Sequence, residues 1–319
     1  MSSFLRLVRF KNLLIVAFTM SMTVYGIINP VLQLFNIKSD FMPLDIVFLI
    51  LACVFVTAGG YVINDYFDTK TDRINRPETL IVSNTVSRTT AIAWHIILSV
   101  LGCLLGFMVS MRIGVWKLGL IYPLAVGLLW YYSAAYKKMF LVGNLVVAFL
   151  TGLVVILPAL YEVPVLMRNP SDNIQYGVLD PFLFLYQTSF LAGFAFMTTL
   201  TREIIKDLED TEGDKAYDAH TLAIVFGMKK TKITTAVLNI LTTLAVTFIM
   251  LNYLPDTKSY IYISVFVIAP LIYLTYKILK IQDKKDCHFC STFMKIIMLL
   301  GILYLLVMRY NFLTFKDEF

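Results

Sequence analysis

Charged residues are scarce in this chain. They make up 15% of its 319 residues, whereas hydrophobic residues make up 59%, and the mean hydropathy is +0.77. Because a soluble globular protein has about 25% charged residues, this scarcity excludes an ordinary soluble enzyme. The apolar residues also come in blocks of roughly 20 residues, the length that a helix needs to cross the hydrocarbon core of a bilayer. The composition therefore predicts an integral membrane protein.

Cysteine and histidine are rare as well, with four and three residues. Cys53 and Cys103 lie in apolar blocks and are expected to be ordinary core residues. Cys287 and Cys290 form a C-x-x-C pair around His288, but zinc sites of this kind use a second pair of ligands, which the sequence lacks. We therefore interpret the cysteines as thiols of a reducing compartment without a metal or redox role.

Nine apolar blocks are expected to be membrane-spanning helices. They cover residues 13–35, 44–65, 91–110, 116–135, 141–161, 182–205, 233–253, 259–279 and 293–313. The first block lacks a small-residue cleavage site, so we interpret it as a retained helix rather than as a signal peptide. The predicted fold is an all-α integral membrane bundle of nine helices, which forms one transmembrane domain over residues 1–319.

The positions of the basic residues predict the orientation of the bundle. The net charge is +6, which is compatible with nucleic-acid binding. However, when the nine blocks are threaded in turn across the membrane, 20 of the 27 lysines and arginines fall on one side. Such residues gather on the cytoplasmic side. We therefore predict a plasma-membrane protein with a cytoplasmic N-terminus, an external C-terminus and no nucleic-acid partner.

An acidic pattern occurs twice. Residues 65–72 read DYFDTKTD and residues 207–214 read DLEDTEGD, so both follow D-x-x-D-x-x-x-D and both come after an apolar block. The copies end the second and the sixth block, which puts them on the same, cytoplasmic side. This is the arrangement expected of two four-helix pseudo-repeats plus one helix, packed around a central cavity.

Helical geometry would place the acidic residues of each copy on one face. At 100° per residue Asn64, Asp68 and Asp72 fall within an arc of about 80°, with Asp65 in the same sector, and Asp207, Asp210 and Asp214 fall within about 60°. Such crowded carboxylates repel one another and need a positive partner. Oxygen ligands suit Mg²⁺, which is usually held by a few carboxylates together with phosphate oxygens. A single aspartate of this kind is usually only solvated, but the matched pair predicts a magnesium site for a phosphate-bearing ligand.

The two acidic segments resemble the signatures of the UbiA-type intramembrane prenyltransferases. Residues 64–77, NDYFDTKTDRINRP, resemble the first signature. Residues 206–215, KDLEDTEGDK, resemble the second in the D-x-E-G-D form, which is typical of the branch that contains digeranylgeranylglyceryl phosphate synthases, homogentisate prenyltransferases and chlorophyll synthases. The resemblance covers nearly the whole chain, with supporting matches at Arg9-x-x-Asn12, Tyr132-Ser133-x-x-x-Lys137, Gly143-Asn144 and Thr221-Leu222 with Gly227.

This resemblance implies a magnesium-dependent transfer of an isoprenoid chain from an allylic prenyl diphosphate to a lipophilic acceptor. The implied ligands of Mg²⁺ are Asn64, Asp68, Asp72, Asp207, Asp210 and Asp214, of which Asp68, Asp72, Asp210 and Asp214 are also the implied catalytic residues. The implied substrate-binding residues are Arg9, Asn12, Asp65, Arg73, Tyr132, Ser133, Lys137 and Arg202. Aromatic faces can stabilise an allylic cation, and the aromatic residues near the acidic ends are Tyr66, Phe67, Tyr131, Tyr132 and Tyr136, although simple packing is the more common role of such rings.

The acceptor is less constrained than the reaction. The second signature favours geranylgeranylglyceryl phosphate, an ether-lipid precursor, with geranylgeranyl diphosphate as the favoured donor. The family often continues Arg-Pro with a second Arg-Pro and a Pro-Ser-Gly turn, but here residues 78–84 read ETLIVSN. Because this loop is expected to border the acceptor, an aromatic acceptor of quinone or tocopherol synthesis stays open.

Two functions of other classes are also compatible with acidic helix ends. One is an ion- or proton-coupled transporter, but its site usually lies near the middle of the bilayer, whereas both acidic segments here lie at one membrane edge. The other is a non-catalytic scaffold of the same fold. We favour the enzyme because the matched segments suit a metal ion and a diphosphate.

Overall fold

The structure is a computed structural model that describes residues 3–75, 77–168, 170–254 and 256–316. Within these ranges the regular secondary structure is helical, apart from an isolated bridge between Val82 and Val86, and short turns and loops connect the helices. The helices are α1 (Ser3–Leu7), α2 (Phe10–Thr23), α3 (Asn29–Leu34), α4 (Pro43–Asn75), α5 (Arg88–Arg112), α6 (Ile121–Ala134), α7 (Val142–Arg168), α8 (Asp172–Gln175), α9 (Leu183–Glu209), α10 (Thr211–Ala216), α11 (Leu222–Tyr253), α12 (Thr257–Ile263), α13 (Ala269–Leu279) and α14 (Lys284–Lys316).

Eight helical segments in the described part of the chain are long and apolar enough to cross a membrane. They are Phe10–Leu34, α4, α5, α7, α9, α11, Thr257–Leu279 and α14. The predicted helix at 116–135 differs, because a 3₁₀ turn at Trp116–Leu120 precedes the 14 residues of α6. The multi-pass helical prediction is confirmed in this form, while the count of nine and the repeat layout stay predictions.

Proline shapes two of the membrane helices. A π-helical turn at Val24–Ile28 joins α2 to α3 just before Pro30, and a second one at Ser264–Ile268 joins α12 to α13 just before Pro270. Proline lacks the backbone N–H that continues the helical ladder, and in membrane helices a local π-turn can satisfy the backbone groups that proline leaves free. The chain therefore keeps its direction through both segments.

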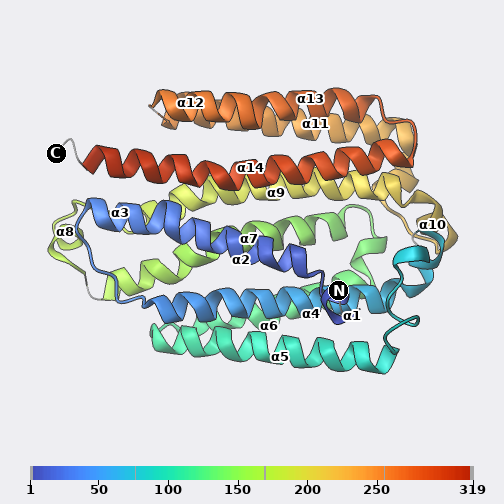
Figure 1. The fold of residues 1–319 in the computed structure, drawn as a ribbon, viewed down its shortest axis with the longest axis horizontal. Coiled ribbons are helices and arrows are strands. Elements are labelled where there is room, and N and C mark those ends of the chain that lie inside the picture. The colour runs from blue at the N-terminus through green and yellow to red at the C-terminus, as the bar shows by residue number, and fades with distance from the viewer. Residues whose placement is uncertain (1–2, 76, 169, 255, 317–319) are drawn as a thin grey trace.

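The long helices pack side by side in two groups (Figure 1). One hydrophobic cluster fills the space among α2, α4, α5, α6 and α7, and another fills the space among α9, α11, α12, α13 and α14. The most extensive helix pairs are α4 with α5 and α7 with α9. At Gly102 on α5, an added Cβ would lie 2.7 Å from the side chain of Val56 and 2.9 Å from the carbonyl oxygen of Ala52, so glycine permits the close approach of α4.

The outer surface is apolar. Leu104 on α5 exposes 61% of its surface and Leu124 on α6 exposes 67%, although both sit in the middle of helical segments. Such exposure would be costly in water but is natural against lipid, where helices associate by packing and by polar contacts. The outward leucines therefore agree with the membrane location that the composition predicts.

The ends of α4 and α9 lie together at one end of the bundle, next to α10 (Figure 1). α4 continues ten residues beyond its predicted end at residue 65 and carries the whole first acidic segment. The second segment does not lie on one continuous helix, because α9 ends at Glu209 and α10 begins at Thr211. Of its three aspartates only Asp207 lies on α9, so the prediction that all three share one face of a single helix does not hold.

Candidate active site

A cavity of about 900 Å³ lies between the helices, within the range of about 300–1,000 Å³ that is usual for ligand cavities. Its walls come from α2, α4, α6, α7, α9 and α14, and they include apolar residues such as Val56, Leu153 and Ile302. Both acidic segments line it, with Asn64, Asp68, Asp72, Asp207, Asp210 and Asp214. Two segments more than 130 residues apart in sequence therefore line the same cavity.

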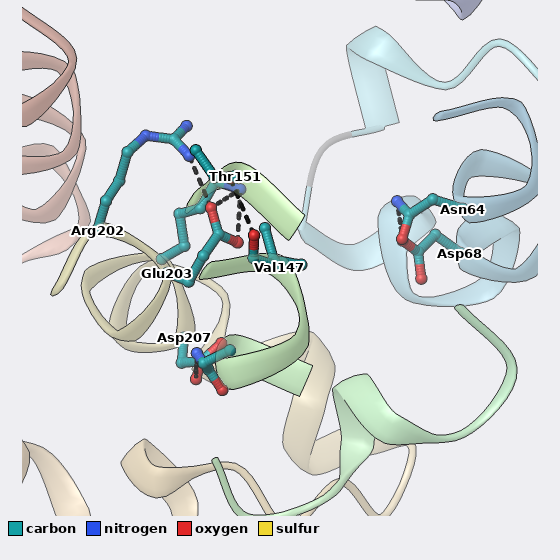
Figure 2. Close-up of polar contacts among 9 residues, drawn as sticks. Asn64, Asp68, Val147, Thr151, Arg202, Glu203 and Asp207 are labelled. Carbon is teal, nitrogen blue, oxygen red and sulfur yellow. Dashed lines mark hydrogen bonds and ion pairs between the residues drawn. The ribbon is translucent and has the colours of Figure 1, made fainter. Parts of the chain in front are cut away.

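On α4, the first acidic segment forms ion pairs and leaves one oxygen atom unpaired. The amide Nδ2 of Asn64 donates a hydrogen bond to Oδ2 of Asp68 at 2.7 Å (Figure 2). The amide Oδ1 of Asn64 is buried and has no hydrogen-bond partner among the described residues. Asp65 accepts from Nη2 of Arg9 at 2.8 Å. A buried oxygen without a donor is a ready ligand for a hard cation.

Lys137 connects the loop after α6 to the first acidic segment. It forms an ion pair with Asp68. Burial lowers the pKa of Lys137 to about 7, and the charge of Lys138 acts in the same direction, while Asp214 and Asp65 oppose the shift. An anion that enters this end of the cavity would favour the protonated lysine, so Lys137 is suited to bind a phosphate group.

In the second acidic segment, Asp207 is held by a hydrogen bond and Asp214 has a shifted pKa. Asp207 accepts a hydrogen bond at 2.8 Å from Nδ2 of the buried Asn144 on α7. Burial raises the pKa of Asp214 to about 6, and the neighbouring charge of Asp210 adds to the rise. Glu209 points elsewhere and contacts Nδ1 of His288 at 3.2 Å. Lys137 and Lys138 act against this rise but do not cancel it, so the half-buried carboxylates of Asp210 and Asp214 would gain from a further positive charge.

Asn75, the last residue of α4, holds the two acidic segments together. Its Nδ2 donates to the carbonyl oxygen of Asp210 at 3.1 Å, and its Oδ1 accepts from the N–H of Gly213 at 2.9 Å. A Cβ on Gly213 would lie 2.4 Å from Nδ2 of Asn75. The glycine of the D-x-E-G-D pattern is therefore needed because the Asn75 amide fills the space of a side chain. Lys284 adds a third contact by donating to the carbonyl oxygen of Asn75 at 2.9 Å.

The predicted substrate-binding residues divide into two groups. Six line the cavity: Arg9, Asn12, Asp65, Tyr132, Lys137 and Arg202. Ser133 is 1% exposed, outside the cavity lining, and donates to the carbonyl oxygen of Leu129. Arg73 is exposed on the outer side of α4 and does not line the cavity either. Arg76 of the first signature lies outside the described residues.

The aromatic residues near the acidic ends mostly pack against one another. Phe67 lies edge-on to Tyr66, with ring centroids 5.2 Å apart, and Tyr131 stacks on Tyr136 at 5.9 Å. Of the five rings considered from the sequence, Tyr132 is the one that the cavity lining includes among the described residues. In the loop after Pro77, Glu78 and Ile81 line the cavity, as expected for a loop that borders a substrate.

Sequence reasoning did not assign a role to four residues that the structure brings to the site. Asn75 joins the segments as described above, and Glu203, Lys206 and Lys295 line the cavity. For Glu203 a signal was available, because it lies one helical turn before Asp207 and therefore on the same face of the helix. Neither the contact of Asn75 with Gly213 nor the position of Lys295 on α14 has a signal in the spacing of residues, since both depend on how distant helices pack.

The donor atoms of the site fit a cation, but they do not form a complete cage. Within the described residues, no three histidine, cysteine or acidic side chains lie close enough together to hold a metal ion by themselves. Mg²⁺ is commonly bound by one or two carboxylates, waters and substrate phosphates. The free amide oxygen of Asn64 and the raised pKa of Asp214 therefore fit Mg²⁺ that arrives with a phosphate-bearing ligand.

A multi-pass helical protein with acidic helix ends beside an apolar cavity is built to act on lipids that carry a phosphate group. The chain belongs to the UbiA prenyltransferase family, whose model matches residues 14–305. The resemblance inferred from the two signatures is confirmed, and with it the class of enzyme.

Similar proteins agree with this assignment. The digeranylgeranylglyceryl phosphate synthase of Methanosphaera stadtmanae is 35% identical over 252 residues, which cover 78% of this chain and 82% of that protein. The protein of the same name from Methanobrevibacter smithii is 31% identical over 281 residues, covering 88% and 92%. A solved structure of a UbiA homolog from Archaeoglobus fulgidus bound to DMAPP and Mg²⁺ matches with a TM-score of 0.60 at 18% identity, covering 97% of this chain and 99% of that one. This last likeness concerns the fold.

Proposed function

We propose that this protein transfers an isoprenoid chain, in a magnesium-dependent reaction, from geranylgeranyl diphosphate to geranylgeranylglyceryl phosphate. The observation that carries the proposal is the meeting of two acidic segments, from α4 and from α9 and α10, at one apolar-walled cavity. The names of the relatives from Methanosphaera stadtmanae and Methanobrevibacter smithii support the choice of acceptor.

Mg²⁺ would be held by Asn64, Asp68, Asp72, Asp207, Asp210 and Asp214, together with oxygens of the donor diphosphate. When bound, it supplies positive charge that makes diphosphate a better leaving group. Lys137 lies beside Asp68 and can bind a diphosphate oxygen as a point charge. Arg9 is held by Asp65 and keeps its remaining N–H donors for a second oxygen.

The transfer step exchanges one carbon–oxygen bond for another. The bond between C1 of the donor and the diphosphate oxygen breaks, and its electron pair leaves with diphosphate. The hydroxyl oxygen of the acceptor then donates a lone pair to the allylic C1, and its proton passes to the released diphosphate. The apolar walls around Val56 and Leu153 hold the chain and keep water from the cation, while the face of Tyr132 is available to stabilise it.

The bundle is proposed to cross the plasma membrane nine times, with the acidic ends on the cytoplasmic side. Nε of Arg112, at the end of α5, pairs with Asp45 at 2.7 Å, whereas Lys137, just after α6, pairs with Asp68. Asp45 and Asp68 are 23 residues apart on α4, which is about 35 Å at 1.5 Å per residue. The chain from Arg112 to Lys137, which includes α6, therefore extends about 35 Å along α4, which is enough to cross a bilayer core of about 30 Å.

A transfer assay tests the reaction. Purified protein in lipid nanodiscs receives radiolabelled geranylgeranyl diphosphate, Mg²⁺ and geranylgeranylglyceryl phosphate, and products are identified by mass spectrometry. We expect an ether-linked product that EDTA abolishes. Asp68→Ala and Asp210→Ala should reduce the rate at least about 100-fold, the size of effect seen when transition-state electrostatics are removed.

The matched control for these variants is Asp180→Ala. Asp180 lies near the start of α9, away from the cavity lining, and its carboxylate accepts from the N–H of Phe182. This variant should keep the wild-type rate. Metal-dependent transfer to an aromatic acceptor but not to the glyceryl phosphate would contradict the proposed acceptor, and the absence of transfer to every acceptor would contradict the reaction.

A further inference from the structure

Three basic residues face the cavity next to the second acidic segment, and the metal site does not use them. Arg202 and Lys206 lie on α9 and Lys295 lies on α14, and all three line the cavity. We call these three residues the basic group. One acidic residue, Glu203, lies among them. The question is which anion the remaining positive charge would bind.

Glu203 fixes the two α9 residues of the basic group. Nη1 of Arg202 donates to Oε1 of Glu203 at 2.7 Å, and Nζ of Lys206 donates to both carboxylate oxygens at 2.9 and 3.0 Å. Figure 2 shows the Arg202 guanidinium reaching over the Glu203 carboxylate, with Asp207 further along the same helix. The two side chains are thus held in place before any ligand arrives, which lowers the entropy that binding costs.

The basic group keeps unused donors. Nε of Arg202 is buried and has no hydrogen-bond partner in the described part of the chain. The ammonium of Lys295 lies within electrostatic reach of Arg202 and Glu203, yet no hydrogen bond or ion pair holds it within the described residues. Buried polar atoms are nearly always hydrogen-bonded in proteins. An unpaired guanidinium N–H on a residue that lines a cavity is therefore a sign of a missing acceptor atom.

Charge balance identifies the class of that anion. Three positive side chains and one carboxylate leave an excess of two positive charges. Asp207 does not remove this excess, because Asn144 holds it in the acidic segment, where it is proposed to face the metal. A phosphate monoester carries between one and two negative charges at neutral pH. Its oxygens also match the planar N–H donors of arginine.

The basic group lies beside the second acidic segment, offset from it along α9. Glu203 and Asp207 are four residues apart on the continuous helix α9, which is about 6 Å along its axis. In a glycerol phosphate with one ether chain, the free hydroxyl is only a few bonds from the phosphate. A phosphate on the basic group would therefore bring this hydroxyl next to the donor carbon at the acidic segments.

The geometry points to the basic group as the site that binds the phosphate of the acceptor, an inference that rests on the proposed function. Glu203 is then a positioning residue, because it orients Arg202 and Lys206 without contacting the substrate. The site selects a lipid acceptor that carries a phosphate monoester over the same lipid without it.

Lys295 gives the cleanest test because its removal leaves no buried partner unpaired. The variants are Lys295→Met, the conservative Lys295→Arg, and Lys280→Met as a control, since Lys280 is exposed and contacts Tyr276. Each is assayed in nanodiscs with geranylgeranylglyceryl phosphate and with geranylgeranylglycerol. For Lys295→Met we expect a KM for the phosphorylated acceptor at least about tenfold higher, with the KM for the donor and the Mg²⁺ half-saturation unchanged.

Two further results are expected from the same assay. Lys295→Arg should restore most of the affinity for the phosphorylated acceptor, and Lys280→Met should behave as the wild type. With geranylgeranylglycerol, Lys295→Met and the wild type should be equal. A higher KM for the donor in Lys295→Met would overturn the assignment and place the donor diphosphate on the basic group, and an equal loss with both acceptors would also overturn it.

A binding measurement separates this inference from the proposed function. The thermal unfolding of detergent-solubilised protein is followed with each acceptor and without the donor. If the wild type transfers no chain but the phosphorylated lipid raises the Tm of the wild type and not of Lys295→Met, the proposed reaction is wrong and the phosphate site is supported. If the phosphorylated lipid raises the Tm of both proteins equally, the phosphate site is wrong.

Discussion

At the acidic segments, the protonation state of one side chain, Asp214, should depend on whether Mg²⁺ is bound. Asp214 has a pKa raised to about 6 by burial and by the charge of Asp210, so a large part of it is protonated just below neutral pH. A carboxyl group must lose its proton before it can coordinate Mg²⁺, so protons and metal compete for Asp214. Binding of Mg²⁺ should therefore weaken as the pH falls through 6, and it should not depend on pH through Asp214 well above that value, where the carboxyl group is already ionised.

This competition gives a pH-dependent prediction. Below pH 6 the half-saturating concentration of Mg²⁺ should rise, by up to about tenfold for each pH unit, because each bound proton must be displaced. The measurement is the Mg²⁺ dependence of the transfer rate between pH 5 and pH 8. In Asp214→Asn the metal should bind more weakly than in the wild type above pH 6, where Asp214 is ionised, and the pH dependence should be flatter because the two proteins converge at lower pH. A half-saturation that stays constant from pH 8 to pH 5 in the wild type would contradict the role of Asp214.

At the scale of helices, the sequence predicted the positions of the acidic segments better than their shapes. Apolar blocks predict helices well because burial in a membrane demands internal hydrogen bonding, but they do not reveal where a helix continues into polar sequence. α4 extends to Asn75 because its polar end packs on α10 and on the turn after Asp210. The break between α9 and α10 likewise accompanies a tertiary contact, because Asn75 binds the backbone of Asp210 and Gly213 there.

The contact between Asn75 and Gly213 predicts a specific coupling between two helix ends. Gly213→Ala would push a methyl group into the Asn75 amide, break the hydrogen bonds to Gly213 and Asp210, and leave buried polar groups that cost about 1–3 kcal/mol each. We expect the transfer rate to fall about tenfold or more, together with weaker Mg²⁺ binding, because the two sets of metal ligands would move apart. Enzyme kinetics at varied Mg²⁺ concentration would measure both effects.

A double-mutant cycle distinguishes this coupling from a general loss of stability. In an Asn75→Ala background the added methyl group no longer meets the amide, so Gly213→Ala should cost less than it does in the wild type. Gly193→Ala on α9 is the matched control, since an added Cβ there meets nothing within 4 Å. Equal costs of Gly213→Ala in both backgrounds would mean that the Asn75 contact does not set the geometry of the site.

Across the whole molecule, the sequence was sufficient for the class of fold and for the residues that gather at one end of the cavity. The hydropathy of the blocks and the repeated spacing depend on residues that are close together in the chain, so a single sequence is enough to recognise them. The basic group beside Glu203 was missed as a unit because Lys295 comes from α14, some 90 residues after Arg202 and Lys206. Its members meet only when the last helix packs against α9.

The path of the chain through α6 can be tested by labelling substituted cysteines in intact cells. Lys117 and Lys138 are exposed on either side of α6, so a membrane-crossing α6 puts them on opposite faces of the membrane. With nine crossings and a cytoplasmic N-terminus, Lys117→Cys should react with a membrane-impermeant maleimide from outside. Lys138→Cys should react only after the cells are permeabilised, because the bilayer core excludes a charged reagent.

A second pair of positions calibrates the labelling. Tyr176 is 79% exposed near α8, at the end of the bundle opposite α10, where Lys215 is exposed (Figure 1). Tyr176→Cys should be labelled from outside and Lys215→Cys from inside, since α9 connects the two ends whatever the path of α6. If Lys117→Cys and Lys138→Cys react from the same side while this second pair does not, α6 does not cross and the count of nine is wrong. If Lys215→Cys reacts in intact cells and Tyr176→Cys does not, the acidic ends face the exterior, and the charge distribution misled the assignment of orientation.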